Sequence, residues 1–286
     1  MRHGAMAFVP FLFSGFSPAA HRLTRPKLRA SNPTMRQIFR SIPYFLPADP
    51  DWVRELFLEH GRAVRFAAGE TLKWGGEARR LFFLTSGLCA YTLDTTESRP
   101  AILSVIAPGR AMGDLTASIN NRCNIRTTAL VESDVLLLEP ERLTAAFEAK
   151  SKFASSEIAN VIAKEESIIE GMTANFTRSP EERLKVFLKA AFVNAGMLPL
   201  GASSGAGSGD RSEDEFLEFP YALSAERMGE ALNLNRVSVA KLFSKWRREE
   251  LVARRGRTLL VSTALFADLF DWIENPGAAT LPDWRR

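Results

Sequence analysis

The stretch from Leu223 to Trp246, LSAERMGEALNLNRVSVAKLFSKW, limits most strongly what this chain can fold into. Ser224 is a favoured residue at the start of a helix, and apolar residues follow it at helical spacing: Met228, Ala231 and Leu232. The Asn-Leu-Asn segment at 233–235 predicts a turn, because Asn tolerates bent and left-handed backbone. A second helix is then predicted from Arg236 to about Glu250.

This second helix has two unlike faces. One face is apolar and expected to be buried: Val239, Leu242, Phe243 and Trp246. The opposite face is polar and basic: Arg236, Ser238, Lys241 and Lys245. Two helices joined by a short turn, with a basic outer face on the second, are typical of a helix-turn-helix DNA reader. The alternative is an ordinary helical hairpin with a solvated charged face.

A predicted β-hairpin follows the helix pair. Gly256 stands between basic residues and is flanked by short apolar runs, a pattern that indicates a tight hairpin. A basic hairpin after a recognition helix is typical of a wing that contacts the phosphate backbone, here through Arg254, Arg255 and Arg257. Basic residues also outnumber acidic ones from Leu223 to Val261, as DNA binding requires.

Composition narrows the class of protein. The 286 residues suffice for two domains, and the formal net charge of +4 is compatible with nucleic acid. The cysteines, Cys89 and Cys123, provide no disulfide framework and are too few for a four-thiolate iron–sulfur cluster. They favour a reducing cytoplasm. Three histidines leave few ligands for a metal, so no metal site is predicted, and no apolar run approaches the ~20 residues of a membrane-spanning helix.

The N-terminus has a composition of its own. Ala5 to Phe16 is apolar with a basic start, which resembles a short signal-peptide core. Met35, however, stands directly before the first amphipathic segment. We therefore interpret residues 1–34 as a disordered extension or as the product of an upstream start.

The middle of the chain predicts a β-domain between helices. A short helical region is expected from Arg36 to about Gly61. Short apolar runs separated by turn residues then predict strands near 64–66, 71–72, 81–84, 89–93, 101–106, 128–130 and 135–138. Many short strands at regular spacing indicate an antiparallel barrel or jelly roll. A short helix from Glu141 to Ala149 and a long one from about Phe153 to Phe176 are expected next.

The long helix carries an apolar seam at spacings of three and four: Ile158, Val161, Ile162, Ile168, Ile169, Met172 and Phe176. Glu165 interrupts the seam and is a candidate for fixing its register. The periodicity leaves two possibilities open. The seam either pairs with a second copy of the helix or packs against the chain's own β-domain.

The helix after the seam has a clear start signal, because Ser179 caps it, Pro180 takes its first position and acids follow. The Gly/Ser-rich residues 201–214 predict a mobile loop, and Phe216 to Tyr221 a short strand. The expected organisation is an extension at 1–34, a sensor β-domain with flanking helices at 35–150, a dimerisation helix at 151–178, a winged helix-turn-helix domain at 179–274 and a tail at 275–286.

In this order of elements the chain resembles the cyclic-AMP receptor / fumarate–nitrate regulator (Crp/Fnr) family of bacterial transcription factors. The resemblance spans roughly Arg36 to Phe266 and is carried by LSAERMGEALNLNRVSVAKL and by AAGETL, FFLTSGL, LSVIAPGRAMGDL and IRTTAL. It implies an α+β fold with an N-terminal antiparallel jelly-roll (cyclic-nucleotide-binding-like) domain, a dimerisation helix and a C-terminal winged helix-turn-helix. It also implies a homodimer that binds a palindromic operator in double-stranded DNA, with RNA polymerase as a further partner and no enzymatic activity.

The resemblance places an effector between Gly113-Asp114-Leu115 and the loop that ends at Arg126-Thr127, next to the long helix. The implied effector residues are Gly113, Asp114, Leu115, Arg122, Cys123, Arg126, Thr127, Ile168, Ile169 and Met172. Backbone at Gly113 can approach a ligand closely, and Arg122 or Arg126 can clamp an anionic group. Alternatively, Asp114 forms a structural ion pair with a nearby Arg, or each is simply solvated.

Three departures from the nucleotide-binding members argue against cyclic AMP. Asp114 stands where those members carry Glu, and an ungapped count puts Cys123-Asn124 where they carry an Arg-Ser or Arg-Thr phosphate clamp. The same count puts Ile168 and Ile169 where they offer hydroxyl groups to the purine, and isoleucine cannot hydrogen-bond a base. An apolar or aromatic anion, a haem held by His60, Cys89, Cys123 or a methionine, or no small ligand at all remain open. Cys89 and Cys123 are also candidates for oxidant sensing.

On the DNA side, the resemblance implies base contacts from the exposed N-terminal face of the second helix. The implied DNA-binding residues are Ser224, Asn235, Arg236, Val237, Ser238, Lys241, Arg254, Arg255 and Arg257. Arg236 can make two hydrogen bonds to a guanine edge. Val237 stands where familiar members carry Glu; it cannot accept from cytosine but can contact a thymine methyl, so the half-site is expected to differ.

Two other classes of protein compete with a DNA-binding regulator. A jelly-roll metabolite-binding enzyme would usually carry metal ligands in its barrel, yet no histidine lies between Val64 and Glu139. A haem or redox sensor with the same fold is the second alternative, and bound haem would show as a Soret band.

Overall fold

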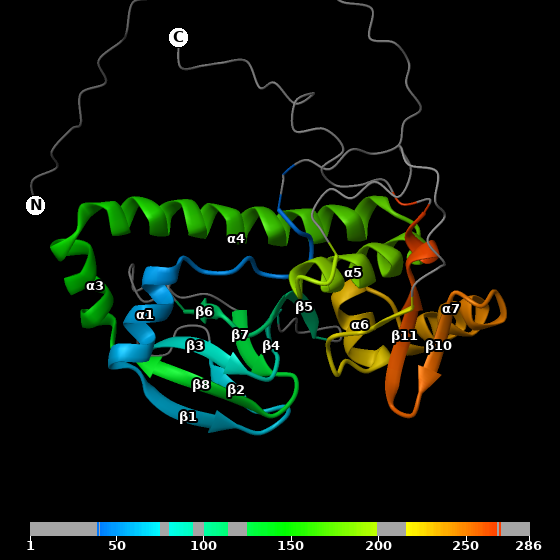
Figure 1. The fold of residues 1–286 in the computed structure, drawn as a ribbon, viewed down its shortest axis with the longest axis horizontal. Helices are drawn as coiled ribbons and strands as arrows, with labels where there is room; N and C mark the ends of the chain where they lie inside the picture. The colour runs from blue at the N-terminus through cyan, green and yellow to red at the C-terminus, as the bar shows by residue number, and fades with distance from the viewer. Residues whose placement is uncertain are drawn as a thin grey trace, which may run out of the picture. The chain divides into compact units, whose positions relative to one another are not determined.

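Two antiparallel four-stranded sheets form the N-terminal β-domain (Figure 1). A computed structural model describes residues 39, 41–74, 80–93, 100–113, 125–198, 216–267 and 269. One sheet has the order β1 (Arg62–Phe66), β8 (Ser133–Leu138), β3 (Leu81–Ser86), β6 (Arg110–Met112). The other has the order β2 (Thr71–Lys73), β7 (Ile125–Ala129), β4 (Cys89–Leu93), β5 (Ala101–Ile106). All these pairings are antiparallel, as the strand spacing predicted.

Two sequence predictions in this region need correction. The strand β6 was not predicted, because it is only three residues long and follows a Pro-Gly pair. The helical region expected from Arg36 to Gly61 is helical only at α1 (Asp51–His60) among its described residues. Instead, Phe45 forms a parallel bridge with Val105 of β5, and Leu46 N donates to Val105 O at 3.0 Å. Phe45 and Leu46, which lie in the segment expected to be helical, are instead fully buried core residues beside β5.

Apolar side chains between the two sheets form the core of the β-domain, with Leu46, Leu72, Phe82, Leu84, Cys89, Ile106, Met112, Ala129 and Val135 at its centre. A second cluster lies under α1 and α3 (Pro140–Ala149), around Phe57, Phe83 and Leu143. The turn at Ser86-Gly87, predicted from the sequence, needs its glycine. Gly87 has φ +90°, and a Cβ there would lie 2.4 Å from Glu132 O.

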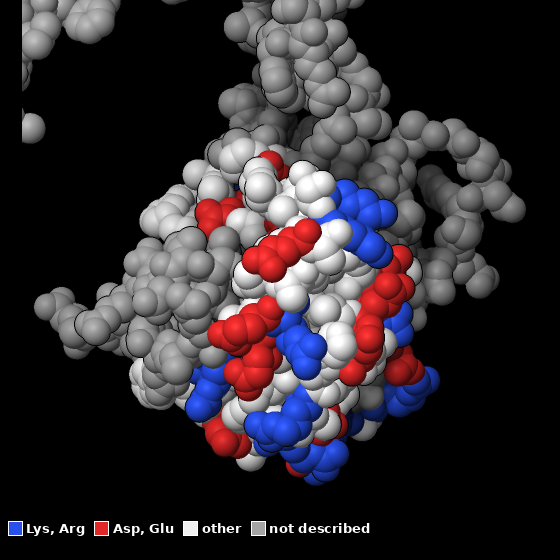
Figure 2. Space-filling model, turned by 90° about the vertical axis from the view of Figure 1, so that its left-hand side faces the viewer, with Lys and Arg blue, Asp and Glu red and all other residues white. Residues whose placement is uncertain are grey.

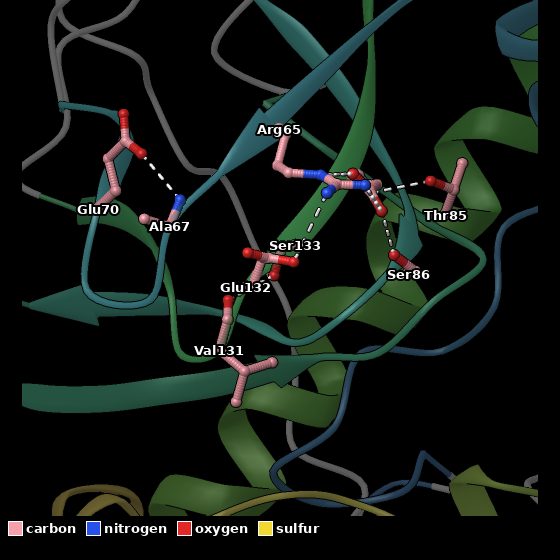
Figure 3. Close-up of polar contacts among 9 residues, drawn as sticks. Arg65, Ala67, Glu70, Thr85, Ser86, Val131, Glu132 and Ser133 are labelled. Carbon is pink, nitrogen blue, oxygen red and sulfur yellow. Dashed lines mark hydrogen bonds and ion pairs between the residues drawn. The ribbon is translucent and has the colours of Figure 1, made fainter.

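Polar side chains connect the edge strand β1 with the next two strands of its sheet, β8 and β3 (Figure 3). Arg65 Nε donates to Asp134 Oδ1 at 2.7 Å, and Ser86 Oγ donates to Asp134 Oδ2 at 2.9 Å. Thr85 Oγ1 bonds the Asp134 carbonyl at 2.9 Å. The hydrogen bonds from Arg65 and Ser86 lower the pKa of Asp134. The network links β1, β3 and β8 at their shared end.

The long helix α4 (Ser151–Thr177) follows α3 and leads to α5 (Pro180–Asn194). The predicted start of α5 is confirmed. Ser179 Oγ accepts from Glu182 N at 3.3 Å, and Glu182 Oε2 accepts from Ser179 N at 3.0 Å, which completes a capping box.

The C-terminal region contains the two predicted helices and the predicted hairpin. The helices are α6 (Ala225–Leu232) and α7 (Arg236–Arg248). The hairpin consists of β10 (Val252–Arg255) and β11 (Thr258–Ser262), extended by β9 (Phe216–Glu218) and followed by the 3-10 turn η1 (Thr263–Phe266). No described helix is both long enough and apolar enough to cross a membrane. The expected extension at 1–34, the loop at 201–214 and the tail at 275–286 lie outside the described residues.

Candidate nucleic-acid interface

The α6–α7 pair is held by a cap at the start of each helix and a left-handed turn between them. Ser224 Oγ accepts from Arg227 N at 3.2 Å, and Asn235 Oδ1 accepts from Ser238 N at 2.7 Å. Asn233 has φ 52° and ψ 45°, the left-handed conformation that its residue type tolerates. The side-chain oxygens of Ser224 and Asn235 therefore act as helix caps, in addition to any contact with DNA.

Gly229 allows the turn to close tightly, a role that was not predicted from the sequence. Its carbonyl accepts from Leu234 N at 2.9 Å, and a Cβ at this position would lie 2.6 Å from Leu234 O. The signal in the sequence was a glycine in the middle of an otherwise good helix, where it costs stability unless packing requires it.

The outer face of α7 carries the predicted reading residues. Arg236, Val237 and Lys241 are exposed and Ser238 is half-buried. The Val237 side chain is 62% exposed. The opposite face anchors the helix through Val239 and Trp246, which are fully buried, and through the half-buried Leu242 and Phe243.

Glu181 fixes the C-terminal part of α7 to α5. Its carboxylate accepts from Lys245 Nζ at 2.8 Å and from Trp246 Nε1 at 3.0 Å. These hydrogen bonds lower the pKa of Glu181 below its ordinary value. Lys245, predicted on the outer basic face, instead pairs with Glu181 and positions the helix.

We expect Glu181→Gln to lower the free energy of unfolding at pH 7 by about 1 kcal/mol, because Lys245 is partly exposed and screened. Since the folded-state pKa is lowered, this stabilisation is present above the unfolded-state pKa and is lost as the pH falls below about 4. Urea unfolding at pH 7 and pH 3 measures both values. The matched control is Glu226→Gln in the first turn of α6. An equal loss for Glu181→Gln at both pH values would contradict the assignment.

The hairpin presents its arginines around a two-residue loop. Gly256 takes φ +61° in that loop, a conformation that suits a two-residue hairpin connection. Arg254, Arg255 and Arg257 are all exposed. Arg255 also forms an ion pair with Glu218 on β9, so one of the three predicted phosphate contacts has a partner within the chain.

Charge is distributed differently on the side of the molecule that bears α3. Figure 2, which views the side bearing α3, shows acidic and basic side chains interspersed, with no area dominated by one sign. DNA binding requires a local excess of positive charge, and the sequence from Leu223 to Val261 has that excess.

The helix α4 is inverted: its apolar side is exposed and its polar side is buried. Five large apolar side chains are exposed by 42–79%: Ile158, Ile162, Ile169, Met172 and Phe176. Together with the exposed Glu165 they recur at alternating intervals of four and three, the spacing of a coiled-coil seam. Val161 and Ile168, also predicted in the seam, are half-buried, and Ile168 packs against the core of the β-domain.

Polar side chains line the buried side of α4: Glu157, Asn160, Lys164, Ser167 and Glu170. Lys164 Nζ lies 2.8 Å from Asp49 Oδ1, and Asn160 Nδ2 donates to the same oxygen at 2.7 Å. Ser167 Oγ bonds Phe45 O at 2.7 Å. Both packing possibilities left open by the sequence are thus partly realised: Ile168 packs against the described β-domain, whereas the five exposed apolar side chains of α4 do not.

The predicted effector residues are only partly described. Asp114, Leu115, Arg122 and Cys123 lie outside the described residues. Gly113 directly follows β6 with φ +84°, and a Cβ there would lie 3.7 Å from Lys73 Nζ. Lys73 is paired with the buried Thr127 across β2 and β7.

The other described effector candidates do not converge on one side. The Arg126 guanidinium lies over the Trp74 ring at 5.0 Å, and consecutive strand residues such as Arg126 and Thr127 point to opposite faces. Ile169 and Met172 lie on the exposed seam of α4, whereas Ile168 contacts the β-domain. Ile168 thus faces the β-domain while Ile169 and Met172 face away from it, and the effector role of all three stays a prediction.

Cys89 does not fit an oxidant-sensing or haem-binding role. It is fully buried, and burial raises the pKa of its thiol to about 11, so the reactive thiolate is scarce at neutral pH. His60 is the last residue of α1, and its Nε2 lies 3.5 Å from Oε1 of the neighbouring Glu59. Within the described ranges, no group of three or more His, Cys, Asp or Glu side chains is arranged to hold a metal ion.

Known structures share this fold, although no protein-family model and no curated protein sequence matches the chain. FixK2 from Bradyrhizobium japonicum is 15% identical over 70% of this chain and 92% of that chain, with a TM-score of 0.57. A mutant of CooA from Carboxydothermus hydrogenoformans is 16% identical over 73% and 86%, with a TM-score of 0.55. TTHB099, a transcriptional regulator of the CRP family from Thermus thermophilus, is 23% identical over 71% and 94%, with a TM-score of 0.53. This chain therefore has the fold of the Crp/Fnr family of transcription regulators.

Proposed function

We propose that the chain is an effector-responsive transcription regulator that binds a palindromic operator as a homodimer. The observation that carries the proposal is the outer face of α7, where Arg236, Val237 and Lys241 are exposed on a helix whose other side is anchored by buried Val239 and Trp246. Arg236 provides a bidentate donor for guanine, and Val237 an apolar contact for a thymine methyl. Ser224, Asn235 and Ser238 complete the proposed reading face.

The proposed wing supplies affinity rather than specificity. Arg254 and Arg257 extend from a hairpin that directly follows α7, so they are placed to contact the phosphates beside the groove that α7 enters. Arg255 would have to exchange its contact with Glu218 for a phosphate. RNA polymerase is the proposed further partner, as for a regulator of transcription.

The exposed apolar seam of α4 supports the proposal that two copies of the chain dimerise through this helix. The helix has 27 residues, about 40 Å at 1.5 Å per residue, and its apolar side chains follow coiled-coil spacing over most of that length. A second copy of the same helix matches this spacing and would bury the seam. The two-fold symmetry of such a dimer matches a palindromic operator.

The effector is proposed to be a molecule other than cyclic AMP. CLP is described as c-di-GMP responsive, and CprK is seen in complex with OCPA, so proteins with this fold are associated with different small molecules. Ile168 is packed against the β-domain core and offers no hydrogen bond to a purine. We propose that the effector binds between Gly113 and Thr127.

The salt dependence of DNA binding tests this function. We expect the logarithm of the association constant for duplex DNA to fall linearly with the logarithm of salt concentration. Arg254→Ala should reduce that slope by about one unit per chain and weaken all DNA sequences alike. Fluorescence anisotropy measures both effects. Binding that is insensitive to salt would contradict a DNA-binding role.

A further inference from the structure

A non-helical strap, residues 41–49, runs along the polar side of α4 (Figure 1). At one end, Ser41 Oγ donates to Glu166 Oε2 at 2.9 Å. At the other, Asp49 receives the bonds from Asn160 and Lys164 described above. Asn160, Lys164, Glu166 and Ser167 of α4 thus bond the strap, which helps explain why this side is buried despite its polarity.

Tyr44, in the middle of the strap, has a conformation that needs external support. Its φ is 67°, which is rare for a bulky residue, and its side chain is almost fully buried. The Tyr44 carbonyl accepts from Val105 N on β5 at 2.7 Å. On the other side, a Cβ on Gly171 of α4 would lie 3.1 Å from Tyr44 N, so glycine allows a close approach that a larger residue would crowd.

The Tyr44 side chain reaches α6 through a single amide. Tyr44 Oη donates to Asn175 Oδ1 at 3.0 Å, and Asn175 Nδ2 donates to the carbonyl of Ala231 at 2.9 Å. Burial raises the pKa of Tyr44, so its hydroxyl remains a donor. Ala231 lies in the last turn of α6, where carbonyls lack partners within the helix. Its bond to Asn175 therefore joins α6 to α4 directly.

The next strap residue makes a second junction with the C-terminal region. The Phe45 ring is stacked on Tyr221 at 5.5 Å and lies 5.1 Å from Phe187 of α5. Tyr221 Oη donates to Asn194 Oδ1 at 2.8 Å, and Asn194 Nδ2 donates to Leu46 O at 3.2 Å. Phe45 and Leu46, which directly follow Tyr44, are therefore attached to α5 and to Tyr221.

We infer that Tyr44 and Asn175 are positioning residues that set the pose of the α6–α7 pair on α4, and thereby the spacing of half-sites that the dimer accepts. The inference rests on the proposed function, because spacing matters only if two copies read one duplex. Two recognition helices must lie about 34 Å apart to enter successive major grooves, and one base pair changes that distance by about 3.4 Å. The Tyr44–Asn175–Ala231 chain fixes the reading pair to the helix that carries the apolar seam, so it is placed to hold this distance.

Tyr44→Phe and Asn175→Ala test the inference on operators whose half-sites are moved apart or together by one base pair. The wild type should prefer one spacing. Tyr44→Phe removes one hydrogen bond and should reduce that preference roughly three- to tenfold, and Asn175→Ala, which removes two, should reduce it at least as much. Affinity for a single half-site should remain within about twofold of wild type, because the reading face is untouched. Ser244→Ala is the control, since it removes a side-chain bond to Ala240 O within α7 and should leave the spacing preference unchanged.

Two results would overturn the positioning role: variants with the wild-type spacing preference, or variants weakened equally on every DNA, including the single half-site. The second result would mean that both residues act only on stability. A wild type without any sequence preference would instead contradict the proposed function itself, so the two failures are distinguishable.

Discussion

Arg236→Ala is expected to remove most of the sequence preference of the protein while leaving weaker, salt-sensitive binding to any duplex. The side chain is exposed on the first turn of α7, and a bidentate contact to guanine is worth about 1–3 kcal/mol of discrimination, or roughly 5- to 150-fold for each half-site. The phosphate contacts of Arg254 and Arg257 would remain. The ratio of affinities for operator and scrambled DNA measures the effect.

The control for this substitution is Arg247→Ala. Arg247 is also an exposed arginine of α7, but it lies at the C-terminal end of the helix, away from the proposed base contacts. Its removal should lower the affinity for operator and scrambled DNA alike. If Arg236→Ala keeps the wild-type ratio, the N-terminal turn of α7 does not read bases.

Ile162→Glu is expected to split the dimer. Ile162 is 53% exposed at the middle of the apolar seam, and the symmetry of a dimer would bring two new carboxylates together there. A buried charge without a partner costs about 3–5 kcal/mol, so the dissociation constant of the dimer should rise roughly a hundredfold or more. Analytical ultracentrifugation should show monomers at concentrations where the wild type is dimeric, and operator affinity should fall with the loss of dimers.

Leu58→Glu provides the matched control. Leu58 is 59% exposed on α1, so the change is chemically the same but lies off the seam. It should leave the oligomeric state unchanged. A dimeric Ile162→Glu variant would mean that another molecule or segment covers the α4 seam.

The elements of the fold followed from local signals in the sequence. Alternating short apolar runs predicted seven of the strands in the β-domain, and the Ser179-Pro180 start and the Asn-rich turn predicted helix ends that the structure confirms. These features depend on residues close together in the chain, where propensity and capping act. The exposed outer face of α7 was predictable for the same reason, because helical periodicity alone places Lys241 on the side of the helix opposite the buried Val239.

The junctions between elements were not predictable in this way. The seam of α4 was visible in the sequence, but only the contacts of Asn160 and Lys164 with Asp49 show that the opposite, polar side faces the protein. Tyr44 was expected to lie in or near a helix, and its left-handed backbone depends on β5 and Gly171, both distant in sequence. Lys245 was predicted to face solvent because its partner, Glu181, lies 64 residues away.

Selection from a pool of randomised duplex DNA tests the central claim most directly. A homodimer that reads DNA through two copies of α7 should enrich an inverted repeat whose half-sites are centred about 10–10.5 base pairs apart. Contacts from Arg236 should appear as guanine at one position of each half-site, and a neighbouring thymine should reflect Val237. Enrichment of a single unrepeated site, or no enrichment over the starting pool, would contradict the account.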